Sequence, residues 1–137
     1  MKLVIDTNCL IQILPRRSRY HTVWQSFEAG ENIMCISNEI IEEYTEILQR
    51  LIDTETAELT VSTILNSPFV HYANPYFKFN LISADPDDNK FVDCAIAAGA
   101  KYIVSNDRHY DILKKINYPK VDVIPLDEFI KTNHTKH

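Results

Sequence analysis

Short apolar runs rich in β-branched residues alternate along this chain with segments whose apolar residues recur at helical spacing. The run Leu3-Val4-Ile5 is continuous rather than alternating, which is typical of a strand that is buried on both faces. The pattern predicts strands over residues 3–5, 33–36, 69–72, 102–105 and 121–124. It predicts helices over residues 8–14, 20–29, 38 to about 51, 54 or 56 to about 65, 85–98, 108–115 and 126–131.

Local signals mark the ends of several of these helices. Pro15 ends the first helix, and Gly30 and Gly99 follow the second and the fifth. The pair Asp85-Pro86 puts an acid at the cap and a proline at the first helical position, which is a strong start signal. Strands that alternate with helices require crossover connections. We therefore expect an α/β fold with a mainly parallel central sheet flanked by helices on both faces.

Composition adds limits to this picture. The chain has 137 residues, 45% of them hydrophobic and 24% charged, which suits one globular domain. We expect that domain to span residues 1–131, with a loop at 73–84 and a loose tail at 132–137. No segment approaches the ~20 apolar residues of a membrane span, and the N-terminal apolar run stops after three residues at Asp6, too short for a signal peptide. The expected location is the cytoplasm, without membrane contact.

Charge and metal-ligating residue types narrow the chemistry. The net charge of −5 counts against bulk nucleic-acid binding, but not against an enzyme that reaches phosphate through a bound cation. The three cysteines lack any paired ligand spacing, and the five histidines are scattered. A zinc site is therefore not expected, and carboxylate oxygens are the candidate functional groups.

Two acids follow predicted strands. Asp6 comes directly after the first strand, and Asp107 comes two residues after the strand that ends at Ser105. In parallel α/β sheets, ligands bind beyond the carboxyl ends of the strands, so both acids fall at the binding edge. Each acid alone has a second reading, because Asp often caps a following helix. Their shared location favours a site.

Two further acids lie on helices. Glu43 lies three residues after Ile40 and four before Ile47, so it flanks the apolar stripe of its helix. Asp93 lies in a helix that is apolar almost all round, where an unpaired carboxylate would be costly. Asp85, Asp87 and Asp88 suit the positive end of the helix dipole, and Asp88 is the one of these three that we expect nearest the site. The expected ligand set is thus Asp6, Glu43, Asp93 and Asp107.

Four converging carboxylates raise one another's pKa values, and a divalent ion removes that penalty. Oxygen ligands without a convergent histidine or cysteine favour Mg²⁺ or Mn²⁺. Such a site suits phosphoryl chemistry, in which the metal polarises the phosphate and lowers the pKa of a bound water.

The chain resembles a PIN domain over nearly its whole length. The matching segments are Val4-Ile5-Asp6-Thr7-Asn8, Ser37 through Glu43-Tyr44, Asp85-Pro86-Asp87-Asp88-Asn89-Lys90-Phe91 into Asp93 and Ala95-Ile96-Ala97, and Ile103-Val104-Ser105-Asn106-Asp107. Within that family it is most similar to the VapC-like toxins of bacterial type II toxin–antitoxin pairs.

The resemblance implies a Rossmann-like three-layer fold, an Mg²⁺- or Mn²⁺-dependent endoribonuclease that leaves a 5′-phosphate and a 3′-hydroxyl, a homodimer, and a small antitoxin partner. It gives Asp6, Glu43, Asp93 and Asp107 the roles of metal ligands. It places Asn8 and Ser105 as residues that orient the ligands, and we expect Asp88, from its place in the first turn of its helix, to have the same supporting role.

Residues that grip RNA are harder to predict. Arg16, Arg17 and Arg19 form a basic cluster between the first two helices, and Arg108 adjoins Asp107. These arginines could contact the RNA backbone, but a solvated loop explains the cluster equally well. The aromatics could stack bases, although core or dimer packing is the commoner role of such a cluster. They are Tyr72, Tyr76, Phe77 and Phe79.

Two other functions stay open. A phosphatase or phosphoacceptor domain also places an acid after its first strand, but those domains want a lysine after a later strand, where this chain has Asp107. A PIN scaffold that acts only by binding partners would need none of the carboxylates. Metal-dependent cleavage of RNA separates these alternatives from a nuclease.

Overall fold

Five strands and the helices that connect them follow one another in the order that the apolar pattern predicts. The computed structural model describes residues 1–83 and 85–132. The strands are β1 (Lys2–Ile5), β2 (Ile33–Ile36), β3 (Val70–Tyr72), β4 (Tyr102–Val104) and β5 (Val123–Ile124). The helices are α1 (Thr7–Ile13), α2 (His21–Glu28), α3 (Asn38–Leu51), α4 (Thr54–Asn66), α5 (Asn89–Ala98) and α6 (Leu126–Lys131), with the 3-10 helices η1 (Pro86–Asp88) and η2 (Arg108–Lys115).

The sheet is parallel throughout and has the strand order β3-β2-β1-β4-β5. β1 lies at its centre, with Leu3 paired to Met34 of β2 and to Tyr102 of β4. The order reverses direction at β1, because the chain moves outward to β2 and β3 and then returns to β4. The side chains after β1 and β4 therefore lie next to each other at such a switch point, where open α/β sheets bind ligands.

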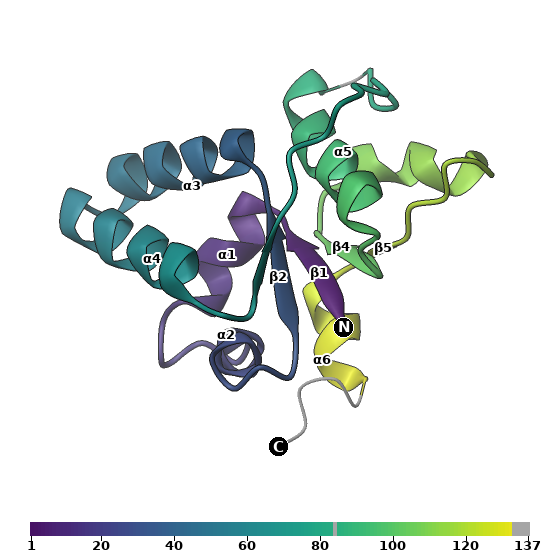
Figure 1. The fold of residues 1–137 in the computed structure, drawn as a ribbon. Helices are drawn as coiled ribbons and strands as arrows, with labels where there is room; N and C mark the ends of the chain where they lie inside the picture. The colour runs from purple at the N-terminus through teal and green to yellow at the C-terminus, as the bar shows by residue number, and fades with distance from the viewer. Residues whose placement is uncertain (84, 133–137) are drawn as a thin grey trace.

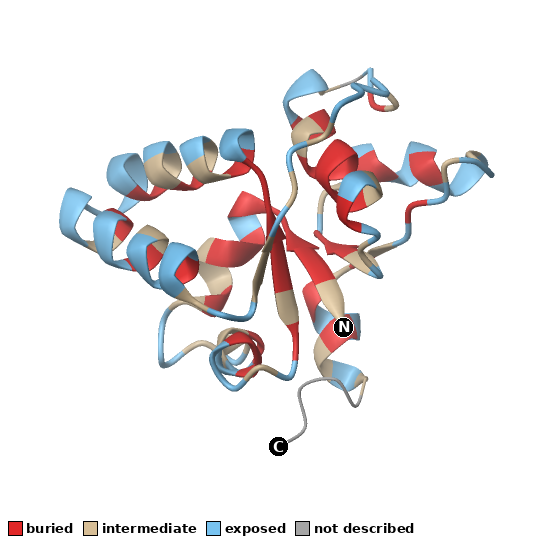
Figure 2. Cartoon of the chain, in the orientation of Figure 1, coloured by how far each residue is buried: buried red, intermediate tan, exposed pale blue. Residues whose placement is uncertain are grey.

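The helices form layers on both sides of the strands, and this confirms the expected fold class (Figure 1). α3 and α4 pack together as a pair on one side, with α1 beneath them, whereas α5 lies across β1, β2 and β4 on the other. The strands and α5 carry much of the buried surface, while the outer faces of α3 and α4 are exposed (Figure 2). α5 therefore holds its first turn rigidly beside the carboxyl end of the sheet.

Local chemistry explains where the main helices begin and end. The Ser37 hydroxyl accepts a hydrogen bond from the backbone N–H of Ile40 at 3.3 Å, which caps α3 as the sequence predicts. Asp53, rather than the expected threonine, caps α4 through the N–H of Thr56. Gly99 ends α5 in the left-handed conformation with φ 66°, which a residue with a Cβ adopts only at a cost.

Two predicted helices differ from the expectation. The helix expected from Asp85 starts as the 3-10 helix η1 and becomes α-helical only at Asn89. The helix expected over residues 108–115 is 3-10 throughout. In both cases aspartates accept hydrogen bonds from the backbone two residues later, which favours tight local turns over a regular α-helix.

No helix in residues 1–83 and 85–132 is long and apolar enough to span a membrane. The expected tail at 132–137 lies, from residue 133 onward, outside the described residues.

We expect Leu48→Ala to lower the free energy of unfolding by about 2–5 kcal/mol, because it removes a fully buried side chain from the inner face of α3. Leu51→Ala in the same helix is the control, since its side chain is 60% exposed and its loss should cost about 0.5 kcal/mol or less. Urea denaturation of the two variants measures both values. Equal losses would contradict the packing described here.

Candidate metal centre

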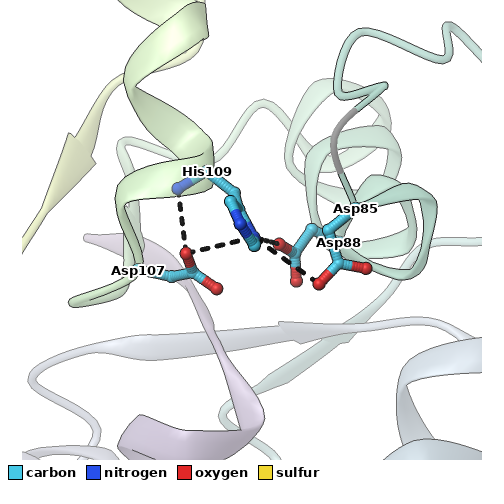
Figure 3. Close-up of side chains that lie close together, drawn as sticks. All are labelled: Asp85, Asp88, Asp107 and His109. Carbon is cyan, nitrogen blue, oxygen red and sulfur yellow. Dashed lines mark hydrogen bonds and ion pairs between the residues drawn. The ribbon is translucent and has the colours of Figure 1, made fainter.

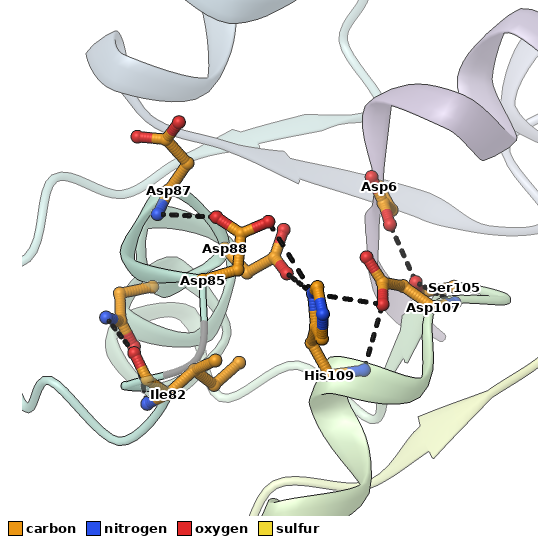
Figure 4. Close-up of polar contacts among 9 residues, drawn as sticks. Asp6, Ile82, Asp85, Asp87, Asp88, Ser105, Asp107 and His109 are labelled. Atoms are coloured by element: carbon orange, nitrogen blue, oxygen red, sulfur yellow. Dashed lines mark hydrogen bonds and ion pairs between the residues drawn. The ribbon is translucent and has the colours of Figure 1, made fainter.

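The ends of β1 and β4 hold two aspartates through one serine. The backbone N–H of Asp6 donates to the carbonyl of Val104 at 3.1 Å, which joins the two strands at their last residues. Ser105 then donates its hydroxyl to Asp6 Oδ2 at 2.6 Å and accepts the N–H of Asp107 at 3.0 Å (Figure 4). Ser105 thus holds the carboxyl group of Asp6 and the backbone of Asp107.

Asp88 brings a third carboxyl group from the start of α5. It is the last residue of η1 and the N-cap residue of α5, it has helical backbone angles, and its side chain makes no capping hydrogen bond to α5. Its pKa is raised to about 7, mainly by burial and also by the charges of Asp85, Asp6 and Asp107, while His109 acts to lower it. The ordinary explanation for an acid in the first turn of a helix, a cap, therefore does not account for this residue.

The same mutual repulsion acts on Asp6. Its pKa is raised mainly by burial; hydrogen bonds from Ser105 and from the backbone of Asn8 oppose that shift, and the charges of Glu43 and Asp107 add to it. Four acids from four segments, Asp6, Glu43, Asp88 and Asp107, are thus close enough to influence one another or a shared neighbour.

Glu43 faces this group from α3 and is held by two other elements. Lys90 of α5 donates its ammonium to Glu43 Oε1 at 2.8 Å, and the Thr7 hydroxyl of α1 donates to Oε2. Both partners of the ion pair are shielded, with side-chain exposures of 17% for Lys90 and 20% for Glu43. Sequence reasoning found Glu43 by its place beside the apolar stripe, but it did not find Thr7 or Lys90.

Asp85 and His109 extend the group on the side away from Asp6. Ligand atoms of Asp85, Asp88, Asp107 and His109 all lie within 4.8 Å of one another (Figure 3). Asp107 Oδ1 accepts the backbone N–H of His109 at 2.8 Å, which turns the imidazole ring toward the carboxylates. The sequence analysis expected no histidine in the site, and the signal it passed over is the two-residue spacing between Asp107 and His109.

Asp93 is not brought into this group. Its carboxylate accepts the backbone N–H of Phe79 at 3.2 Å, and the charged groups that act on its pKa are Glu39 and Lys78. Asp93 lies five residues after Asp88 on α5, which turns it about 140° around the helix axis. The structure therefore does not bring Asp93 to the other carboxylates expected from sequence: Asp88 lies beside them instead, and a backbone donor stabilises the buried Asp93.

The other expected residues have mixed positions. Asn8 donates its backbone N–H to Asp6 Oδ1 at 3.4 Å, but its side chain is exposed. Arg16, Arg17 and Arg19 are exposed in the loop after α1, at the opposite end of that helix from Asp6, and Arg19 pairs with Asp127 at 3.6 Å. Arg108 is exposed beside Asp107. Contact of these arginines with RNA stays a prediction.

The aromatic residues 72–79 do not belong to the core. Tyr76 is 98% exposed and Phe77 is 73% exposed, and the rings of Phe77 and Phe79 are 6.5 Å apart. Tyr72 is 45% exposed and donates its hydroxyl to Asn38. Of the roles expected for this cluster, burial in the monomer is the one that the structure excludes.

A cavity of about 470 Å³ opens beside Asp6 and Asp107, a size usual for small-molecule sites. Its other lining residues are Asn8, Ile11, Gln12, Leu51 and Asn106. The acids thus stand at the wall of a space that a nucleotide could enter.

The residues present fit a divalent cation. In the described residues, Asp88 Oδ2 and the Tyr110 hydroxyl are buried without a hydrogen-bond partner. Burial raises the pKa of Tyr110, and the charges of Asp6, Asp88 and Asp107 raise it further. A buried carboxylate oxygen without a donor is costly, and a cation bound to it removes that cost. Asp6, Asp88 and Asp107 would hold the ion, with Glu43 beside them.

Comparisons with known proteins identify the family and the fold of this chain. The family model described as PIN domain matches residues 2–109. The chain is a member of the PIN-domain family. The comparison with curated protein sequences found no match.

Solved structures share the fold of this PIN domain at low sequence identity. VapBC2 from Rickettsia felis, bound to a DNA fragment from its promoter, is 16% identical with a TM-score of 0.62, and the match covers 91% of this chain and 98% of that chain. DNA-bound VapBC from Salmonella typhimurium is 17% identical with a TM-score of 0.60 over 92% and 98%. VapC20 from Mycobacterium tuberculosis, described as a sarcin-ricin loop cleaving toxin, is 13% identical with a TM-score of 0.57 over 87% and 98%.

We expect the stability of the metal-free PIN domain to fall as the pH rises from 3.8 to about 7, the interval over which Asp88 gains charge. Because the folded-state pKa of Asp88 is raised, its contribution to folding is complete below the unfolded value and is lost as the pH rises through the folded value. Asp88→Asn should remove this part of the pH dependence and stabilise the protein near neutral pH. Chemical denaturation in EDTA at a series of pH values measures the effect.

Asp87→Asn is the control, because Asp87 is exposed on the same 3-10 helix. That variant should keep the pH slope of the wild type. A slope in Asp88→Asn as steep as that of the wild type would show that Asp88 does not carry the buried charge.

Proposed function

We propose that this PIN domain is a divalent-metal-dependent endoribonuclease of the cytoplasm, the toxin of a toxin–antitoxin pair. The observation that carries the proposal is that Asp6, Asp88 and Asp107 lie together at the switch point of the sheet. The charge of Asp107 raises the pKa of Asp6, and the charges of Asp6 and Asp107 raise the pKa of Asp88. The fold shared with the VapC proteins supports the same reading, since one of them is described as a cleaving toxin. The proposed cation is Mg²⁺ or Mn²⁺.

The chain's own residues divide the work of the reaction. Asp6, Asp88 and Asp107 hold the cation, and Ser105 keeps Asp6 and Asp107 in register by its two hydrogen bonds. A bound divalent ion supplies charge to polarise the phosphate and lowers the pKa of a water molecule. The RNA backbone lies in the cavity beside Asp6 and Asp107, where the scissile phosphate reaches the same edge.

Glu43 acts beside this set rather than within it. Its two oxygens accept hydrogen bonds from Lys90 and Thr7, so Glu43 is placed to orient an attacking water or the cation's outer ligands. Water adds its oxygen to phosphorus, the bond to the 3′ oxygen breaks, and that oxygen takes a proton. The products are a 5′-phosphate and a 3′-hydroxyl.

We expect purified protein to cleave RNA with Mn²⁺ or Mg²⁺ and to stop when EDTA is added. Asp88→Asn should lower the rate at least about a hundredfold, because it removes charge that holds the cation. Asp93→Asn is the matched control, since it changes a buried aspartate of α5 that contacts Phe79 instead. Its rate should stay comparable to that of the wild type. Gel analysis of end-labelled RNA measures each rate.

Other outcomes would replace the proposal. Absence of cleavage by a protein that binds Mn²⁺ would favour a PIN scaffold that acts by binding alone. A stable aspartyl-phosphate on Asp6 after treatment with acetyl phosphate would favour a phosphoacceptor domain. Loss of activity in Asp93→Asn, with Asp88→Asn still active, would show that Asp93 and not Asp88 is the functional carboxylate, as expected from sequence.

A small antitoxin protein is the proposed partner, and a homodimer the proposed assembly. Two of the structural neighbours are VapBC complexes, which supports this extension. Co-expression with the product of the adjacent reading frame should yield a copurifying complex in which RNA cleavage is inhibited. Light scattering on the purified chain measures the dimer. An adjacent product that neither binds nor inhibits would contradict the toxin assignment but not the nuclease.

A further inference from the structure

His109 stands among three carboxylates without a good hydrogen bond from its ring to any of them. Its Nδ1 lies 3.3 Å from Asp107 Oδ1, 3.5 Å from Asp85 Oδ2 and 3.6 Å from Asp88 Oδ2 (Figure 3). A hydrogen bond between nitrogen and oxygen usually measures about 2.7–3.2 Å. The imidazole Nδ1 therefore lies at similar distances from three carboxylate oxygens and forms a hydrogen bond with none of them.

The spacing of these four groups suits a divalent ion. Bonds of about 2.1 Å place ligands on opposite sides of an ion about 4.2 Å apart. The ligand atoms of Asp85, Asp88, Asp107 and His109 lie within 4.8 Å of one another. A contraction of about 0.6 Å in the widest separation thus brings the group to bonding range.

An independent observation points to a ligand at this place. Asp88 is only 8% exposed, and its Oδ2, which faces His109, has no hydrogen-bond donor in the part of the chain that the structure describes. Asp85 and Asp107 each use one oxygen for a backbone N–H, at 3.2 Å and 2.8 Å. The buried oxygen of Asp88 is thus the group in this cluster that a cation would satisfy.

We propose that Asp85, Asp88, Asp107 and His109 form a position for a divalent transition-metal ion in which His109 supplies an imidazole nitrogen. This inference rests on the proposed function, because Asp88 and Asp107 also belong to the proposed nuclease site. It adds Asp85 and His109, which lie outside the carboxylate set expected from sequence. A donor set of mixed oxygen and nitrogen favours Mn²⁺ and other transition metals, whereas Mg²⁺ prefers oxygen alone.

Pulsed EPR on the Mn²⁺-bound full chain, purified without a histidine tag, tests the nitrogen ligand directly. We expect ¹⁴N modulation from the imidazole in the wild type and its loss in His109→Gln. His71→Gln is the matched control, because His71 lies in β3 and away from the acids, and it should keep the signal. A wild-type spectrum without ¹⁴N modulation, or a modulation that persists in His109→Gln, would overturn the proposal.

Calorimetric titration with Mn²⁺ and with Mg²⁺ gives a second measure. His109→Gln should weaken Mn²⁺ binding about tenfold or more and change Mg²⁺ binding by less than about threefold. Asp85→Asn should also weaken Mn²⁺ binding, while its amide oxygen still accepts the N–H of Asp87. His109 is 47% exposed, so the variant is expected to fold, and a thermal melt of the metal-free protein verifies this. Unchanged Mn²⁺ affinity in both variants would overturn the proposal.

The two proposals fail separately. RNA cleavage without a ¹⁴N signal would leave the nuclease standing and remove His109 from the metal. A ¹⁴N signal that depends on His109, in a protein that cleaves no RNA, would keep the metal position and remove the nuclease.

Discussion

Negative charge gathered in a small, shielded volume at the carboxyl edge of the parallel sheet is the constraint on which the rest of the structure depends. Asp6 and Asp88 are both buried, and burial is the largest cause of their raised pKa values. The fold opposes this cost at Asp6 with two fixed donors, the Ser105 hydroxyl and the backbone N–H of Asn8. Among the described residues, no donor hydrogen-bonds to Asp88 Oδ2. Asp88 Oδ2 is the oxygen that the proposed cation would neutralise.

The topology of the sheet brings these charges together without long connecting loops. β1 lies between β2 and β4, so the segments that follow these strands, Asp6, Ser37 with α3, and Ser105 with Asp107, all emerge at one edge. α5 crosses the opposite face and delivers Asp88 to the same edge from its first turn. Residues far apart in sequence are therefore brought together by short segments that follow directly on strands whose last residues are buried.

The sequence predicted what depends on strand position and periodicity. Continuous apolar strands and the helices between them gave the parallel sheet, and the strand ends placed Asp6 and Asp107. Whether Asp88 or Asp93 lies beside Asp6 and Asp107 depends on long-range contacts, which the periodicity of the sequence does not predict. Asp93 accepts a hydrogen bond because the backbone N–H of Phe79, fourteen residues earlier, reaches it, whereas Asp88 makes no capping hydrogen bond of the kind its position would ordinarily imply. His109 could not be placed either, because a 3-10 conformation after Asp107 turns its ring.

Glu43 has a consequence for how an inactive form of this protein should be chosen. Its carboxylate joins three helices at once, since it lies on α3 and accepts from Thr7 of α1 and Lys90 of α5. Replacing Glu43 leaves the Lys90 ammonium and the Thr7 hydroxyl without their hydrogen-bond acceptor. A loss of activity in such a variant could therefore come from a less stable fold as well as from a missing catalytic group. Asp88 ties no other element by a hydrogen bond of its side chain in the described part of the chain. For genetic experiments that need a folded protein without the proposed activity, Asp88→Asn is the better substitution.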